Sequence, residues 1–132
     1  MAGQIEVTEA ALARRDSVAA RAVLKALRAS REDFLAAVDF IAAEAKSNPN
    51  AAYAGSVPYL MLAGNVVAGW QMARALIVAE DQLAAGVDAP FMAAKIATAR
   101  FYAEHILARA GGLRDSIVEG ADSVTAMALD AF

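Results

Sequence analysis

The 132-residue chain is long enough for one domain of ordinary size and too short for two. Hydrophobic residues make up 59% of it, many of them alanine, and glycine and proline are sparse, so a few long helices are favoured over many short strands. The net charge of -3 argues against a nucleic-acid binder, and the absence of cysteine excludes disulfides, thiol catalysis and thiolate metal sites.

The N-terminal stretch lacks the layout of a secretory signal, because acidic residues stand where a basic start and an apolar run are needed. Together with the cysteine-free composition, this fits a cytoplasmic protein. Residues 1–7 show no hydrophobic period, so we expect them to be disordered and the rest of 1–132 to form a single helical domain.

The first predicted helix begins at Thr8, whose hydroxyl can accept a hydrogen bond from a free backbone N–H, and Glu9 suits the helix dipole there. Apolar residues then recur at spacings of three and four. Ser30 and Asp33 have the spacing of a new capping box, but the apolar pattern crosses them without a gap. We therefore expect one long helix from about Thr8 to Lys46, with a bend near Ser30.

The central predicted helix follows a turn at residues 47–50 and a short segment at 51–55. Its first 24 residues, 56–79, carry one formal charge, Arg74, and are apolar or small on every side of a helical wheel. Such a helix is buried on several sides or lies in a membrane. A charge near the middle of a membrane span would cost at least ~2.5 kcal/mol, and the flanks lack clustered basic residues. We predict a packing helix from Ser56 to about Ala85 and no membrane span.

The segment 86–90 ends this helix and starts the next, with Asp88 as the cap and Pro90 in the first turn. Gly111-Gly112 can end the third helix, but apolar residues beyond them allow it to continue to about Val118. After Gly120, a short last helix is expected from residue 122 or 123 through 130. Three long helices and one or two short ones, joined by short loops, predict an all-α antiparallel bundle.

Gly64 and Gly69 have the glycine spacing of a phosphate-binding loop, but Trp70-Gln71 replaces the Lys-Ser/Thr that such a loop requires. We interpret both glycines as points where another helix approaches closely, with Trp70 largely buried beside them. Arg74 lies one turn after Trp70, and a buried arginine must be paired. We expect an ion pair within the domain, with an acid such as Asp39 or Glu104, or across an interface, in preference to an anionic ligand.

His105 is the one histidine of the chain and so the first candidate for a general base. A base needs a nucleophile or substrate group and an orienting partner, and the sequence identifies neither. No Glu-x-x-His pair of the di-iron type is present either. We expect His105 to lie at a seam between helices, and we predict no catalytic, cofactor-binding or metal-binding residue.

Several packing motifs occur in a distinctive order: Pro58-Tyr59-Leu60, Gly64, Gly69-Trp70, Ala94-Lys95, the run at 99–105 and Gly120. In order and spacing, residues from about 18 to 132 resemble the C-terminal extension domain of a branch of bacterial acyl-CoA dehydrogenases. The resemblance implies a longer flavoprotein, in which a glutamate takes the α-proton of an acyl-CoA thioester and FAD takes the β-hydride. Those groups lie mainly in the preceding domains, so the resemblance transfers no catalytic residue to this chain.

The resemblance implies that the chain is a non-catalytic accessory domain, either the C-terminal part of a longer flavoprotein or a free-standing copy of its last domain. It would pack on the preceding dehydrogenase domains or on identical subunits, and we expect a homo-oligomer. The alternative is a stand-alone helical module that binds a hydrophobic ligand or a partner helix. A small enzyme that uses His105 is the third hypothesis.

Overall fold

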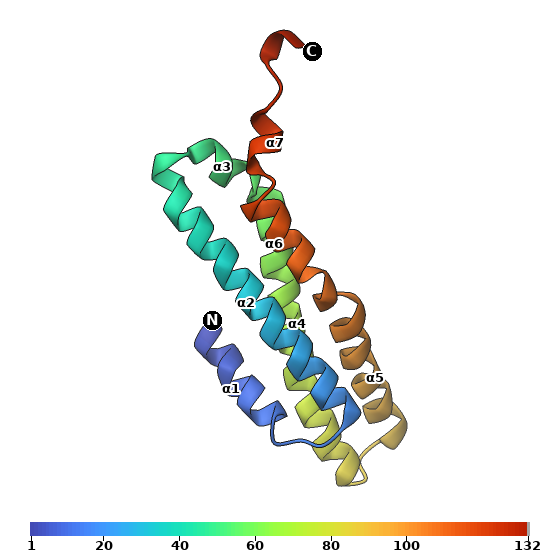
Figure 1. Cartoon of the computed structure of the whole chain (residues 1–132). Coiled ribbons are helices and arrows are strands. Elements are labelled where there is room, and N and C mark those ends of the chain that lie inside the picture. The colour runs from blue at the N-terminus through green and yellow to red at the C-terminus, as the bar shows by residue number, and fades with distance from the viewer. Residues whose placement is uncertain (132) are drawn as a thin grey trace.

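Two long helices run along the molecule in opposite directions, α2 (Val18–Ser47) and α4 (Ser56–Ala84) (Figure 1). The short helix α3 (Pro49–Ala54) joins them at one end, and a turn at 85–88 joins α4 to α5 (Ala89–His105) at the other. The chain then returns beside α2 and α4 through the 3-10 turn η1 (Leu107–Arg109) and α6 (Ala110–Val118). The computed structural model describes residues 1–131 and has no strand within them, so the predicted all-α bundle with three long helices is confirmed.

Three shorter elements complete the described chain. Helix α1 (Ala2–Leu12) packs against α2 and α4. Helix α7 (Ala121–Thr125) contacts α3 and α6, and the 3-10 turn η2 (Leu129–Ala131) follows it beyond the end of the bundle (Figure 1). The expected last helix through residue 130 is therefore two short pieces.

The core combines branched aliphatic side chains with alanine. The large fully buried aliphatic residues come from four helices: Ile5, Leu12, Val23, Leu27, Leu62, Val66, Leu76 and Ile117. Burying one leucine or isoleucine contributes about 1.5–3 kcal/mol. Alanines between them let the helix axes approach closely, and the buried ones in the long helices include Ala37, Ala73, Ala99 and Ala103. The alanine-rich composition thus serves packing as well as helix propensity.

The break in the N-terminal helical region lies at Ser17 and not near Ser30. Ser17 has an extended backbone, and its hydroxyl oxygen accepts a hydrogen bond from the N–H of Ala20 at 2.9 Å, which caps α2. Ser30 is buried inside α2, where its hydroxyl donates to the carbonyl of Leu27 at 3.0 Å. The prediction of one helix from Thr8 to Lys46 is therefore wrong, because a serine cap divides that stretch into α1 and α2.

Residues 2–7, which we expected to be disordered, belong to α1. The buried side of this helix consists of Ile5, Thr8, Glu9 and Leu12. That spacing is helical, but two of its four members are polar, so a search for apolar periodicity misses it.

The other boundaries agree more closely with the sequence. Asp88, in the left-handed backbone region at φ 39°, caps α5 by accepting a hydrogen bond from the N–H of Phe91 at 3.4 Å. The third predicted helix does continue to Val118, but it is interrupted at 106–109 by the 3-10 turn. Gly111 and Gly112 lie inside α6 and end nothing.

Helix α4 is long and apolar enough to cross a membrane by length and composition, and it is the one such helix among the described residues. In this structure α1, α2, α5 and α6 all pack along it. Nevertheless, 28% of its most apolar window is buried, so much of the apolar surface of α4 has no cover within the described chain. This uncovered surface is the starting point for the functional site.

Candidate interaction surface

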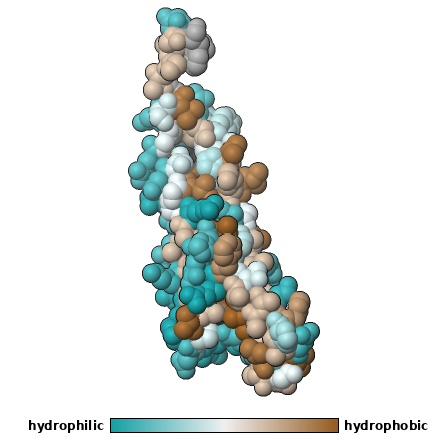
Figure 2. Space-filling model, turned by 90° about the vertical axis from the view of Figure 1, so that its right-hand side faces the viewer, coloured by the Kyte–Doolittle hydropathy of each residue, from teal (hydrophilic) through white to brown (hydrophobic). Residues whose placement is uncertain are grey.

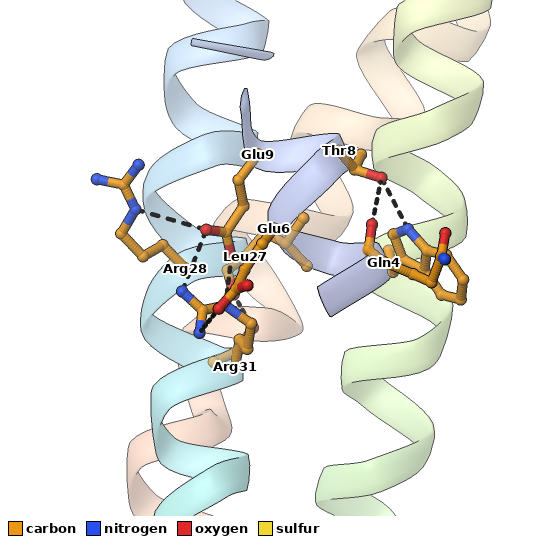
Figure 3. Close-up of polar contacts among 9 residues, drawn as sticks. Gln4, Glu6, Thr8, Glu9, Leu27, Arg28 and Arg31 are labelled. Atoms are coloured by element: carbon orange, nitrogen blue, oxygen red, sulfur yellow. Dashed lines mark hydrogen bonds and ion pairs between the residues drawn. The ribbon is translucent and has the colours of Figure 1, made fainter. Parts of the chain in front are cut away.

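Helix α1 covers one side of α4, and a side-chain hydrogen bond joins the two helices. The indole Nε1 of Trp70 donates to the hydroxyl oxygen of Thr8 at 2.8 Å, and that hydroxyl donates to the carbonyl of Gln4 at 3.2 Å (Figure 3). Trp70 is therefore partly buried, with its polar atom satisfied by a buried threonine. The bond fixes where α1 lies along α4.

A buried ion pair fastens the other side of α1 to α2. Nε of Arg31 donates to Oε1 of Glu9 at 2.8 Å, and Nη2 donates to Oε2 at 3.2 Å, which makes a bidentate pair (Figure 3). Glu6 at 3.1 Å from Arg31 and Arg28 at 3.7 Å from Glu9 extend the cluster. The hydrogen bond with Glu9 raises the pKa of Arg31 against the opposing effect of burial, so the guanidinium stays charged.

A second cluster holds the turn between α1 and α2 to the C-terminal end of α4. Arg15 contacts Glu80 at 3.1 Å and Asp81 at 2.8 Å, and the hydroxyl of Ser17 donates to Glu80. Burial lowers the pKa of Arg15, but its hydrogen bonds to Asp81 and Glu80 outweigh this effect and raise it. Three polar contacts therefore tie α1 and the turn after it to the bundle: Thr8–Trp70 joins α1 to α4, Glu9–Arg31 joins α1 to α2, and Arg15–Glu80 joins the turn to α4.

The side of α4 away from these clusters is open and mostly apolar. We call it the open face and define it by nine residues of α4 and two of α5: Val57, Leu60, Met61, Gly64, Val67, Gln71, Arg74, Ala75, Val78, Phe91 and Lys95, all exposed. Leu60 is 73% exposed and Phe91 52%. Spacings of three and four place the α4 members on one side of the helix. Figure 2, which views the molecule from the side of α5, shows apolar atoms gathered mostly toward one edge and hydrophilic atoms toward the other.

A shallow groove of about 430 Å³ lies between α4 and α5, within the open face. Val78, Ala75 and Ala79 of α4 and Phe91 and Met92 of α5 form its apolar walls. Its remaining lining residues are Gln71, Arg74 and Lys95. The groove is thus an apolar trough with two cations on it.

Both cations rest on aromatic rings. The guanidinium carbon of Arg74 lies 5.6 Å from the ring centroid of Trp70, and Nζ of Lys95 lies 5.1 Å from that of Phe91. Arg74 also donates to Oε1 of Gln71 at 3.0 Å. Neither cation forms an ion pair with any residue in 1–131. The rings orient the two charges without neutralising them.

The predicted ion pair of Arg74 within the domain is therefore wrong. The prediction assumed that Arg74 is buried, but its side chain is exposed to solvent on α4. Glu104, one suggested partner, pairs with Arg100 at 2.8 Å. A partner across an interface is still a prediction.

Gly64 and Gly69 differ sharply in their surroundings. A Cβ built on Gly69 would lie 2.6 Å from Cδ1 of Leu107, so η1 approaches α4 closely at this point. Around Gly64 there is nothing within 4 Å of such a Cβ, because this glycine lies on the open face. The expected helix contact at Gly64 is thus not made inside the described chain.

His105 ends α5 and is exposed, with its ring stacked on that of Phe101 at a centroid distance of 4.5 Å. It does not lie at a helix–helix seam as expected, because the chain turns into η1 directly after it. No group of three or more His, Asp and Glu side chains that could hold a metal ion occurs in the described part of the chain.

Two features escaped the sequence interpretation. The pairs Glu9–Arg31 and Thr8–Trp70 join residues 22 and 62 positions apart, and single-sequence periodicity carries no such information. The open face, in contrast, can be recognised in the sequence. One side of the helical wheel holds Leu60, Val67, Gln71, Arg74 and Val78. The two polar residues of 68–79, Gln71 and Arg74, are both on this side. An apolar helix with its polar residues on one side is predicted to have that side uncovered.

Comparisons with known proteins agree with the resemblance found in the sequence. The model of a family described as acetyl-CoA dehydrogenase C-terminal like matches residues 1–128. A 3-methylmercaptopropionyl-CoA dehydrogenase from Ruegeria pomeroyi (strain ATCC 700808 / DSM 15171 / DSS-3) is 40% identical over 128 residues. The match covers 97% of this chain and 22% of that relative, so the chain spans about a fifth of the relative's length. The chain belongs to the acetyl-CoA dehydrogenase C-terminal-like family.

Proposed function

We propose that the chain is the non-catalytic accessory domain of an FAD-dependent acyl-CoA dehydrogenase and packs against the catalytic domains or a neighbouring subunit. The observation that carries the proposal is the open face of α4 and α5 in a member of this family. A solvent-facing helix is normally polar on its exposed side, and a contiguous apolar side favours a contact with another protein surface. The match to about a fifth of a longer dehydrogenase supports a partner surface within such an enzyme.

The parent reaction in this proposal is the α,β-dehydrogenation of an acyl-CoA thioester, with FAD bound in the other domains. The N-terminus of α4, where a flavin phosphate could be expected to bind, does not fit one. A glycine does precede the N-terminus of α4, but a Cβ on Gly55 would lie 3.0 Å from Cγ2 of Ile117, so α6 closes that end. We therefore assign no residue of the chain to the cofactor or to the chemistry. A cytoplasmic location and a homo-oligomer remain parts of the proposal.

The test uses the Ruegeria pomeroyi dehydrogenase with the matched segment deleted, here called the truncated dehydrogenase. Mixed with the 132-residue chain, it should form a complex that co-sediments in analytical ultracentrifugation. The chain alone should carry no flavin absorbance and should not dehydrogenate acyl-CoA with an artificial electron acceptor. A yellow, active preparation of the isolated chain would contradict the proposal, as would the absence of any complex.

A second groove favours the alternative function, a stand-alone binding module. It has a volume of about 470 Å³ and lies between α2 and the segment from α5 to α6, lined mainly by small residues such as Ala22, Ala26, Ala29 and Ala103. Lys25, Asp33 and Glu104 also line it, which suits an amphipathic ligand. Native mass spectrometry of the mildly purified chain separates the two functions: a stoichiometric small ligand supports the binding module, and an empty chain opposes it.

A further inference from the structure

We propose that the groove between α4 and α5 receives an apolar segment of the preceding dehydrogenase domains, and that a carboxylate on this segment pairs with Arg74 and Lys95. This inference rests on the proposed function and names the surface and the chemistry of the contact. The occupant is another part of the dehydrogenase, not a second copy of this chain.

The walls of the groove define the apolar part of the occupant. Val78, Ala75 and Phe91 present aliphatic and aromatic carbon to solvent in the groove. Beyond the groove, the open face continues along α4 through the exposed residues Val67 and Leu60. Small side chains at Gly64 and Ala75 leave room for close approach of another backbone or side chain. An apolar helix or loop laid along α4 would remove this surface from water, which is favourable in proportion to its area.

The two cations define the charged part of the occupant. Elsewhere on the chain, arginines on packed faces have carboxylate partners: Arg15 with Glu80, Arg31 with Glu9, and Arg114 with Asp33 at 3.5 Å. Arg74 and Lys95 have none in residues 1–131, although the protein is acidic overall. Their contacts with Trp70 and Phe91 hold them at the groove before any partner arrives. Preorganised charges of one sign favour a partner of the opposite sign and suppress the wrong one.

The same charges argue against a symmetric dimer centred on this groove. A two-fold contact would bring Arg74 and Lys95 of one copy against Arg74 and Lys95 of the other. The open face carries no acidic residue to offset four converging positive charges. Juxtaposed like charges are unfavourable, so this face selects a partner with its own carboxylates.

The experiment measures binding of the chain to the truncated dehydrogenase and maps the contact. The double variant R74E/K95E should bind at least about tenfold more weakly than the unmodified chain, because repulsion replaces attraction. The matched control R14E/K46E has the same change in net charge at two exposed basic residues outside both grooves, Arg14 in the turn between α1 and α2 and Lys46 in α2, and should bind within about twofold of the unmodified chain. All four substituted side chains are exposed, and circular dichroism checks that each variant is folded.

Zero-length carbodiimide cross-linking reports the contact directly, since it joins a lysine amine to a carboxylate that touches it. The chain has three lysines, Lys25, Lys46 and Lys95, and they lie on different parts of the surface. Lys95 should join to an aspartate or glutamate of the truncated dehydrogenase, and the other two should not.

The outcomes separate this inference from the proposed function. A complex that forms equally well with R74E/K95E, or that cross-links through Lys25 or Lys46 alone, overturns the inference and leaves the accessory role intact. The absence of any complex overturns both. A dimer of the isolated chain that R74E/K95E disrupts would assign the groove to a second copy and also overturn the inference.

Discussion

Two sides of the apolar helix α4 differ in this fold: one is covered by α1 and the other is exposed to solvent. On one side, α1 covers the helix, and its polar groups are satisfied: Trp70 donates to Thr8, and Glu9 pairs with Arg31. On the other side, the open face keeps exposed apolar residues and the two unpaired cations Arg74 and Lys95. The comparison indicates that, in this fold, an apolar surface covered within the chain is bordered by polar groups that have partners. The open face lacks such a border, which is why we propose that a partner covers it.

The largest expected effect is a difference in stability between two leucine-to-alanine variants, one on the buried side of α4 and one on the open face. Leu62 is fully buried and Leu60 is 73% exposed, two residues away on the same helix. Leu62→Ala should reduce the free energy of unfolding of the isolated chain by about 2–5 kcal/mol, because it leaves a cavity. Leu60→Ala should change it by less than about 0.5 kcal/mol. Urea denaturation measures both, and similar losses would show that the open face is closed in solution.

The next effect concerns the clamp on the covered side. Arg31→Met should reduce the free energy of unfolding by about 1.5–3 kcal/mol, because Glu9 then retains only the more distant Arg28 as a charged partner. The control Arg100→Met breaks an exposed pair with Glu104 and should cost about 0.3–0.5 kcal/mol. Equal losses in thermal or urea unfolding would mean that α1 is not held by a buried pair.

The two glycines of α4 give a smaller effect with opposite signs. Gly64→Ala should stabilise the chain by about 0.5–1 kcal/mol, because alanine is the better helix former and its Cβ meets nothing. Gly69→Ala should destabilise it by about 1–2 kcal/mol, since the buried side chain of Leu107 must move away. Melting temperatures of the two variants that shift in the same direction would contradict this assignment of the faces.

The smallest effect is a pH dependence. Burial raises the pKa of the Tyr102 hydroxyl, which donates to the carbonyl of Asn65 at 3.3 Å. The folded state therefore holds this proton more tightly than the unfolded state, whose tyrosine pKa is about 10. The resulting stability is fully present below about pH 10 and is lost as the pH rises through the folded pKa.

Urea titrations at pH 8 and pH 10.5 test this dependence. The loss of stability between the two values should be smaller for Tyr102→Phe than for the unmodified chain. Tyr53→Phe, at a tyrosine that is 72% exposed, is the control and should leave the loss unchanged. If both variants lose as much as the unmodified chain, Tyr102 is not buried as described.

Local sequence signals predicted most of the fold, and contacts between distant residues account for what they missed. Helical periodicity and the Asp88 cap placed α4 and α5, because those signals lie within a few residues. The division at Ser17 was missed, since Ser30 has Asp33 at the capping-box spacing and Ser17 has Ala20 there. The contact that fixes the turn in space joins the distant residues Arg15 and Glu80. Gln71 and Arg74 share one side of α4, a local pattern that indicates an uncovered side, and the expectation of a buried Arg74 overlooked it.

The most direct measurement of the central claim compares the oxidation of two methionines. Met61 lies on the open face and is 54% exposed, and Met127 lies beyond α7 and is 60% exposed. In the isolated chain, dilute peroxide should convert both to the sulfoxide at similar rates, read by mass spectrometry. In the complex with the truncated dehydrogenase, we predict that Met61 is protected and that Met127 still reacts. A complex in which Met61 is oxidised as fast as in the isolated chain would contradict the account.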